Sequence, residues 1–453
     1  MSSFLSFSRR MFLGQTIISL LPLSTRSEEP ATQDGFRIIE ASPASLQLLP
    51  EPAKPTPVLA FDGRVPGPLL RYKKGAEIRI RLLNKLDQPT SLNWHGMRIV
   101  NAMDGVAGLT QDPVPPGGSF DYRFVPPDSG FFWYHPQVPA FARTQQARGL
   151  YGALIIDEES KPEVDLDLLL VLSDWTLDEK NAIADFPSDT TQPGSQLTVN
   201  SHPVPATEVL APGARLRIRL LNAADSRIML VVFEGITPVI LAIDGQPCEP
   251  FEPQRQTIPI GPGARFDILC DLPSDAGAPA DLSLLDERGK GPVLLQFKTQ
   301  GERRATLPPM GPLEPNSLLP QAIKLEAAHR ADLLIEALGS PLADPPLNWK
   351  LNGVAVSGFP PLPLFSVKRG TPVVLTFINH TGFVQSMRVH GHVLRLLHDL
   401  DDGWDPYWRD SVLIAAGRTK HVALIADNRG KWAIEAFIAG RQASGLASWF
   451  QVT

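Results

Sequence analysis

Histidine and cysteine are the residues in this chain that could bind a metal or carry electrons, and few of them lie in a pattern. The chain has nine histidines and two cysteines among 453 residues. Three histidines lie in short aromatic or glycine-bearing stretches, namely His95 in SLNWHGMRI, His135 in FFWYHPQ and His390 in MRVHGH. Imidazole nitrogens are common ligands of zinc and copper. The Walker loop, the dinucleotide-binding glycine pattern, HExxH and the nucleophile elbow do not occur in the sequence.

The elements that must position these side chains are short strands. Three runs have the two-residue period of a half-buried strand: AEIRIRLLN (76–84), ARLRIRLLN (214–222) and TPVVLTFIN (371–379). Each run ends on an asparagine, namely Asn84, Asn222 or Asn379. An internal repeat at the spacing of a small β-domain indicates copies of one module.

The repeats divide the chain into three predicted β-domains. The expected boundaries are 36–157 for domain 1, 166–298 for domain 2 and 323–453 for domain 3. Residues 299–322 are polar and rich in proline, and they are predicted to form an inter-domain linker. The 45 prolines and 35 glycines fit many short strands joined by turns. Short helical turns are expected only in AFARTQQARGL (140–150) and EAAHRADLLIEAL (326–338).

The N-terminus and the overall charge bear on where the chain works. Residues 1–30 carry a twin-arginine pair, Arg9-Arg10, before a short apolar run, a pattern typical of a Tat signal peptide. The run is too short to cross a bilayer, and no later apolar stretch is long enough for a membrane helix. The cleaved chain is therefore predicted to be soluble, without a transmembrane helix, and periplasmic. A net charge of −6 without a run of Lys and Arg argues against nucleic acid as a partner.

Several stretches, in order along the chain, resemble the multicopper oxidases. Domain 1 contributes FDGRVPGPLLRYKKGAEIRIRLLN, SLNWHGMRI and MDGVAGLTQDPVPPGGSFDYRFVPPDSGFFWYHPQ. Domain 2 contributes LTVNSHPVPATEVLAPGARLRIRLLNAADSR, LAIDGQP and IPIGPGARFDIL. Domain 3 contributes FVQSMRVHGHVLRLL, WRDSV and GKWAIEAFIAGRQASGL. The resemblance extends over residues 36–453. It implies an all-β fold of three cupredoxin-like Greek-key β-sandwich domains.

The resemblance also implies two copper sites whose ligand positions can be compared one by one. The blue-copper site takes two His and one Cys thiolate, with a weak axial residue. The trinuclear cluster takes eight His in four His-x-His pairs, and the Cys carries electrons between the two sites. Three of the ten ligand histidines are present, namely His95, His135 and His390. The positions without their ligand are Asn93, Gln137, Gln385, Arg388, Glu435, Ala436, Phe437 and Arg441.

The blue-copper position has lost both of its histidines and its thiolate. Its four residues are Gln385, Ala436, Arg441 and Leu446, the last at the axial place. Cys248 and Cys270 belong to domain 2 and cannot replace the missing thiolate; their spacing leaves open whether they pair with each other. Oxidation of a substrate with reduction of O₂ by the family's mechanism is therefore not expected.

Two functions from different classes remain open. The first is a non-catalytic scaffold or binding protein without a cofactor. It would resemble the copper-free, Tat-exported members of the superfamily that serve cell division, and its partner would be another protein of the divisome or envelope. The alternative is a metal-binding protein or a degenerate copper-dependent oxidoreductase that binds Cu or Zn weakly through His95, His135 and His390. The same three residues also fit structural histidines that form hydrogen bonds between domains.

Two of the replacements carry charge and predict a contact. Arg388 and Glu435 are expected to form a buried ion pair in the volume of the former cluster, and Phe437 to fill the space of another ligand. The acidic and aromatic loop HDLDDGWDPYWRD (398–410) is either a binding surface or a solvated loop that its Trp residues anchor.

Overall fold

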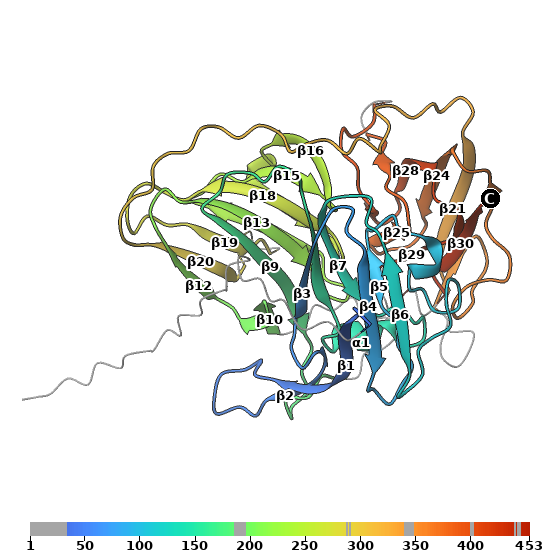
Figure 1. The fold of residues 1–453 in the computed structure, drawn as a ribbon, viewed down its shortest axis with the longest axis horizontal. Coiled ribbons are helices and arrows are strands. Elements are labelled where there is room, and N and C mark those ends of the chain that lie inside the picture. The colour runs from blue at the N-terminus through green and yellow to red at the C-terminus, as the bar shows by residue number, and fades with distance from the viewer. Residues whose placement is uncertain are drawn as a thin grey trace, which may run out of the picture.

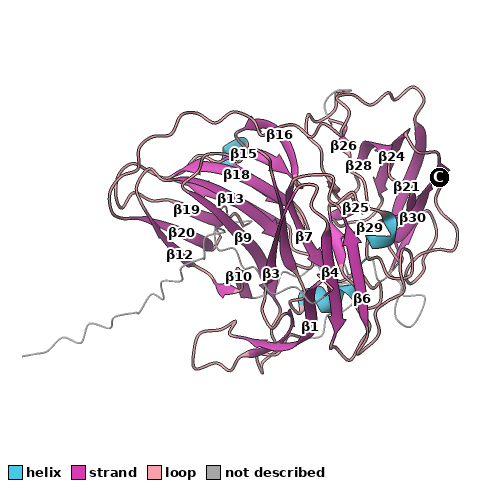
Figure 2. Cartoon of the chain, in the orientation of Figure 1, coloured by secondary structure: helices cyan, strands magenta, loops and turns pink. Residues whose placement is uncertain are grey.

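The computed structural model describes residues 34–184, 196–286, 289, 291–338, 348–398, 403–438, 441 and 445–453. The predicted signal segment, residues 1–30, lies outside the described residues. Within them the chain is almost entirely β-structure, with thirty strands and only short helical segments (Figure 2). The strands form six sheets in three pairs, and each pair makes one β-sandwich.

The first sandwich joins two four-stranded sheets. One has the order β2 (Thr56–Phe61), β1 (Arg37–Leu46), β4 (Ile78–Asn84) and β6 (Ser119–Phe124). The other has the order β3 (Gly67–Lys73), β8 (Gly152–Asp157), β7 (Gly130–His135) and β5 (Asn93–His95). The helical segments η1 (Asn101–Met103) and α1 (Ala142–Ala147) lie between strands. The edge strand β5 and its neighbour β7 carry two of the candidate histidines.

The second sandwich joins a seven-stranded and a five-stranded sheet. The larger has the order β11 (His202–Pro203), β10 (Gln196–Val199), β9 (Leu166–Trp175), β13 (Arg215–Asn222), β18 (Arg265–Asp271), β15 (Val239–Ile243) and β16 (Gln246–Phe251). The smaller has the order β12 (Ala206–Leu210), β20 (Val293–Thr299), β19 (Asp281–Leu284), β14 (Met229–Glu234) and β17 (Thr257–Ile260). A single turn, η2 (Gln254–Gln256), precedes β17.

The third sandwich joins two five-stranded sheets. One has the order β22 (Trp349–Leu351), β21 (His329–Ala337), β24 (Thr371–Asn379), β28 (Thr419–Ala426) and β26 (Arg395–Leu396). The other has the order β23 (Ser366–Val367), β30 (Ala447–Val452), β29 (Gly430–Ala436), β25 (Gln385–Val389) and β27 (Ser411–Ile414). Strands β25 and β29 are neighbours and carry four of the eight replaced ligand positions.

The strand that bears each sequence repeat holds the same place in its sandwich. Strands β4, β13 and β24 pair in parallel with the first strand of their domain, β1, β9 or β21. They pair antiparallel with β6, β18 and β28. The structure therefore confirms three copies of one module.

The terminal asparagine of each repeat makes the same set of hydrogen bonds. Asn84, Asn222 and Asn379 are all fully buried. Each side-chain Nδ2 donates to a carbonyl four or five residues later, at 2.8 to 2.9 Å. Each Oδ1 accepts the backbone N–H two residues later at 3.0 Å. The asparagine thus fixes the turn that follows the strand, because it satisfies backbone groups that would otherwise be buried without partners.

Each sandwich has its own apolar core, and one further cluster joins the three domains. That cluster contains Trp133 and Tyr151 of domain 1, Val171 and Leu221 of domain 2 and Phe437 of domain 3. Burial of apolar surface is the main favourable contribution to such contacts. Phe437, at a replaced ligand position, therefore helps to hold the domains together.

The predicted linker is fixed along domain 2. Leu313 is buried against Leu241 and Leu269 of the seven-stranded sheet. The Arg215 guanidinium donates to the carbonyl oxygens of Pro308 at 2.6 Å and Leu307 at 3.3 Å. This segment crosses over domain 2 on its way to domain 3 (Figure 1). It acts as a strap and not as a free spacer.

One of the two expected helical turns is wrong. Helix α1 forms within 140–150 as expected, but 326–338 contains strand β21. Tertiary pairing decides the second case, because His329 to Ile335 pair with Val373 to Asn379 of β24, and pairing of this kind overrides a weak helix preference. None of the helices in the described part of the chain has the length and apolar character that a membrane crossing requires.

Candidate functional site

The surviving histidines and four of the eight replaced positions meet where domain 1 contacts domain 3. Strands β5 and β7 supply the domain 1 side, and β25 and β29 supply the domain 3 side (Figure 1). We call this cluster the junction, which consists of Asn93, His95, Asp104, His135, Gln137, Arg265, Arg388, His390, Asp410 and Glu435. No member is more than 4% exposed. Polar groups buried to this degree must find partners within the protein or lose stability.

His95 and His135 bind one another. Nδ1 of His95 lies 3.1 Å from Nε2 of His135. Nδ1 of His135 lies 2.9 Å from the carbonyl oxygen of Pro136, which can only accept, so this nitrogen donates. Nε2 of neutral His135 then accepts from His95, which leaves Nε2 of His95 without a proton. Burial, followed by the nearby Arg388 guanidinium, lowers the pKa of both imidazoles well below the usual value, so both are neutral.

His390 lies between two carboxylates. Its Nδ1 is 3.0 Å from Oδ2 of Asp104 and its Nε2 is 2.9 Å from Oε1 of Glu435. Burial and the Arg388 guanidinium oppose protonation of His390, but the two carboxylates outweigh them and raise its pKa. Both nitrogens are therefore committed to hydrogen bonds with acids, one from domain 1 and one from domain 3.

Arg388 and Glu435 do not form the predicted ion pair. They are cross-strand neighbours on β25 and β29, but Nη2 of Arg388 donates to Oδ1 of Asn93 at 3.0 Å. Oε1 of Glu435 instead accepts from Nε2 of Gln137 at 2.6 Å and contacts His390. The expectation failed because two neutral amides from domain 1 compete for the charged groups, and pairing across β-strands alone does not reveal them.

A second set of charged groups reaches the junction from domain 2. Nη2 of Arg265 donates to Oδ2 of Asp410 at 2.6 Å. Asp244 accepts the backbone N–H of Arg265 at 3.0 Å and that of Asp410 at 3.1 Å. Burial, followed by the Asp410 charge, raises the pKa of Asp244 to about 6. A side chain at Gly96, whose φ is +85°, would collide with the Arg265–Asp410 pair.

Four charged residues at or beside the junction were not predicted from the sequence. Asp104, Asp244, Arg265 and Asp410 lie in the stretches MDG, IDG, GARF and WRD. The stretches that contain them were part of the resemblance, but these residues were not singled out. Glycine next to an acid marks two of them, a signal that turns also produce. Only the folded chain brings residues from three domains together.

The blue-copper position is filled by an arginine, an amide and apolar side chains. Nη1 of Arg441 donates to Oε1 of Gln385 at 2.7 Å and to the carbonyl oxygen of Val384 at 2.5 Å. The guanidinium lies 5.0 Å from the ring of Trp349 and 5.5 Å from that of Phe383. These are cation–π contacts. Ala436 and Leu446 beside them are buried.

The residues present do not fit a copper or zinc ion. Of the six ring nitrogens of the three surviving histidines, five are in hydrogen bonds, and only Nε2 of His95 has no partner among the described residues. That nitrogen lies 3.5 Å from Oδ1 of Asp410, with the Arg388 charge nearby. In the described part of the chain, no three His, Cys, Asp or Glu side chains are grouped as a metal site would require. A guanidinium beside the remaining donors repels a metal cation.

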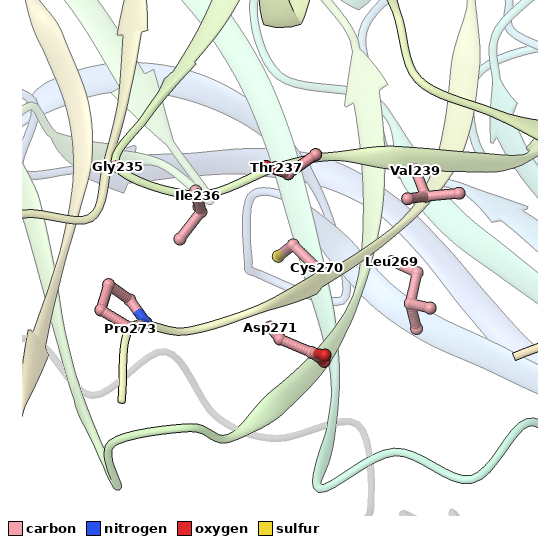
Figure 3. Close-up of a pocket in the computed structure, with 8 residues that line it drawn as sticks. All are labelled: Gly235, Ile236, Thr237, Val239, Leu269, Cys270, Asp271 and Pro273. Atoms are coloured by element: carbon pink, nitrogen blue, oxygen red, sulfur yellow. The ribbon is translucent and has the colours of Figure 1, made fainter. Parts of the chain in front are cut away.

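The cysteines do not supply a replacement thiolate. Cys248 on β16 and Cys270 on β18 are both free and buried, and β15 lies between their strands. Burial raises the pKa of each thiol to about 12, which opposes metal binding and nucleophilic attack. Figure 3 shows Cys270 in the wall of a cleft of about 370 Å³ on domain 2, together with Ile236 and Leu269. No histidine lines the cleft, and none of its lining residues belongs to the junction.

The loop 398–410 is anchored at its described end. Trp408 is buried and the Arg395 guanidinium lies 4.7 Å from its ring. Tyr407 stacks on Phe251 of domain 2 at 5.8 Å between ring centres. Asp410 turns inward to Arg265. Residues 399–402 lie outside the described residues, so the choice between a binding surface and a solvated loop remains a prediction.

Comparisons with known proteins agree with the fold. Multicopper oxidase family models match residues 44–161 and 340–453. The chain is 28% identical to the multicopper oxidase MmcO of Mycobacterium tuberculosis, over 98% of this chain and 96% of that protein. It is 27% identical to copper resistance protein A of Pseudomonas syringae pv. tomato, over 48% of this chain and 43% of that protein.

Solved structures extend the likeness to the whole arrangement. A multicopper oxidase from Pseudomonas thermotolerans superimposes with a TM-score of 0.82 at 29% identity, over 92% of this chain and 98% of that one. Lac15 from a marine microbial metagenome superimposes with a TM-score of 0.76 at 31% identity, over 92% of this chain and 100% of that one. On this evidence, the chain belongs to the multicopper oxidase superfamily.

Proposed function

We propose that this chain is a periplasmic, non-catalytic member of its superfamily that works by binding another protein. The observation that carries the proposal is the blue-copper position. Ala436 stands where the electron-carrying Cys belongs, and Arg441 and Gln385 stand where its two histidines belong. An alanine side chain can neither bind copper nor pass electrons, and a guanidinium has no lone pair for a metal.

The rigidity of the three sandwiches supports a scaffold role. Arg98 of domain 1 contacts Asp128 in its own domain at 2.8 Å and Asp427 of domain 3 at 3.0 Å. Nδ2 of Asn316, on the strap, donates to Asp128 at 2.7 Å and to Gln246 of domain 2 at 2.9 Å. All three domains and the strap thus meet in one network. A surface held in this way loses little conformational entropy when it binds a partner.

The finer part of the proposal rests on resemblance. The twin arginines of residues 1–30 support Tat export to the periplasm, and the loss of copper ligands resembles FtsP (SufI), a cell-division protein. We therefore place the partner in the divisome or the cell envelope. The alternative, a metal-binding or residual copper-dependent oxidoreductase, has one observation in its favour, namely the free Nε2 of His95 facing Asp410.

The test is to locate a partner and look for copper chemistry in the same preparation. A photo-crosslinking amino acid is placed at exposed Val100, Leu230 or Leu362, one in each domain. We expect cross-linking to one envelope protein from one of these faces, unchanged by a copper chelator, and a fluorescent fusion that gathers at the division site. No cross-link from any face, together with oxygen uptake that needs copper and disappears in His95→Ala, would favour the alternative.

A further inference from the structure

The replaced ligand positions pair with one another. Asn93 bonds to Arg388 at 3.0 Å, Gln137 to Glu435 at 2.6 Å and Gln385 to Arg441 at 2.7 Å. Each pair joins one neutral amide to one charged side chain. Six of the eight positions that lost a copper ligand are thus accounted for as three amide–ion pairs.

Two of these pairs join domain 1 to domain 3. Asn93 and Gln137 lie in domain 1, whereas Arg388 and Glu435 lie in domain 3, almost 300 positions away in the chain. The third pair, Gln385 and Arg441, lies within domain 3. This division matches the positions that the family resemblance implies. The replaced positions of the trinuclear cluster come from domains 1 and 3, whereas the blue-copper positions Gln385, Ala436 and Arg441 all lie in domain 3.

We propose that the amide–ion pairs replace the metal ions. The two pairs that span the interface, Asn93–Arg388 and Gln137–Glu435, build in side chains the connection between domains 1 and 3 that copper would otherwise supply, and the third pair fills the blue-copper position within domain 3. The inference is independent of which partner the protein binds. A hydrogen bond to a charged group is stronger than one between neutral groups, which suits a contact that must hold two domains. Within a dry junction, an amide can satisfy a charge without adding another charge.

The buried position of Arg388 supports this role. The side chain is 1% exposed, and its Nε and Nη1 have no hydrogen-bond partner among the described residues. Burial lowers the pKa of Arg388, and the carboxylates of Asp410, Glu435 and Asp104 around it only partly oppose this shift. A guanidinium with so few hydrogen bonds is costly to bury. A positive charge among three acids is what a metal ion would also have provided.

The experiment measures thermal unfolding and hydrogen exchange of the full chain, with and without a chelator or an equimolar amount of Cu²⁺. The wild-type protein is expected to unfold at the same temperature in all three conditions. Asn93→Ala and Gln137→Ala should each speed hydrogen exchange about tenfold in β25 and β29, the domain 3 strands that face the altered residue. A tenfold change corresponds to the loss of one hydrogen bond to a charged group. The matched control is Gln145→Ala, which removes another buried amide whose partners Thr90 and Pro89 both lie in domain 1.

The control variant should destabilise domain 1 without speeding exchange in β25 or β29. Two results would overturn the inference. One is wild-type protein that unfolds at a lower temperature when chelated, because a metal would then make the cross-link. The other is Asn93→Ala and Gln137→Ala protein whose exchange in domain 3 matches that of the control. The comparison of wild-type protein with and without chelator needs no variant. It therefore still decides the question if a variant fails to fold. If the wild-type protein and the variants give the expected results but the protein binds no partner, only the proposed function is refuted.

Discussion

The two regions that lost copper ligands were filled in different ways. The junction is crowded with charge, and its members come from all three domains. The blue-copper position lies within domain 3, and one arginine, one amide and apolar side chains fill it. A site inside a single core needs only volume and a satisfied polar group when its metal is lost. A site between domains also needs new bonds across the interface, and the junction has them.

The largest expected effect comes from breaking the junction at its centre. His390→Leu removes the group between Asp104 and Glu435 and leaves two buried carboxylates facing an apolar side chain. We expect a loss of about 3 to 5 kcal/mol in the free energy of unfolding, measured by urea denaturation at neutral pH. If the loss is no greater than that for a change at the blue-copper position, the distinction between the two regions does not hold.

A smaller effect is expected at the blue-copper position. Arg441→Met removes the bond to Gln385 and the cation–π contacts, at a cost of about 2 kcal/mol. The carbonyl of Val384 and the rings of Trp349 and Phe383, which also contact the guanidinium, are neutral, which is why the expected cost is lower than in the junction. The double variant with Gln385→Leu should recover part of the loss, because both members of the pair then become apolar. A double variant less stable than the sum of the single changes would contradict this account.

A pH dependence of stability should arise beside the junction, at Asp244, which bonds to its members Arg265 and Asp410. The pKa of Asp244 is raised from its usual value of 3.8 to about 6 in the folded protein. The folded chain therefore binds a proton more tightly than the unfolded chain between these values. Stability from this group is present below pH 3.8 and is lost as the pH rises through 6. Asp244→Asn should remove a decline of about 2 kcal/mol over this range.

Thermal unfolding followed from pH 4 to pH 7 checks this prediction against a matched variant. Arg441→Met lies in the other region and should keep the wild-type slope. The neighbouring Asp410 has its pKa lowered, with burial opposed by Arg265 and His95, so its contribution is lost only as the pH falls below its usual range. A wild-type slope in Asp244→Asn would assign the pH dependence to another group.

The smallest expected effect is that of restoring the missing thiol alone. Ala436→Cys returns the sulfur, but Gln385 and Arg441 still occupy the two histidine positions. We expect no blue colour when copper is added and a change in stability below about 1 kcal/mol, read from the visible spectrum and from thermal unfolding. A blue protein would show that the position keeps more copper affinity than its filling implies.

The sequence revealed most of the fold because the fold repeats. Three alternating runs, each closed by an asparagine, marked the same strand in each sandwich, and the hydrogen bonds of Asn84, Asn222 and Asn379 give the physical reason. The misjudged segment 326–338 has no such marker. Its composition suits a helix, and only its pairing with β24 makes it a strand, which is information that lies far away in the chain.

The sequence revealed the identities of the replaced residues but not their partners. The register of β25 and β29 makes Arg388 and Glu435 neighbours, and opposite charges favour a direct pair. The actual partners, Asn93 and Gln137, come from the other end of the chain. A short-range pattern cannot show that two amides compete for these charges. Asp410 was not singled out for the same reason, since its loop is acidic and its contact with Arg265 of domain 2 lies far away in the sequence.

One measurement tests the central claim, that the chain has no path for electrons between a substrate and O₂. The purified protein is titrated with copper under reducing and then oxidising conditions. Bound metal is measured by mass spectrometry, a copper–thiolate bond by its visible absorption, and oxygen uptake with a phenol or a cuprous donor. The account predicts no stoichiometric copper, no blue band and no uptake above that of free copper. Blue protein that consumes oxygen with either donor would contradict it.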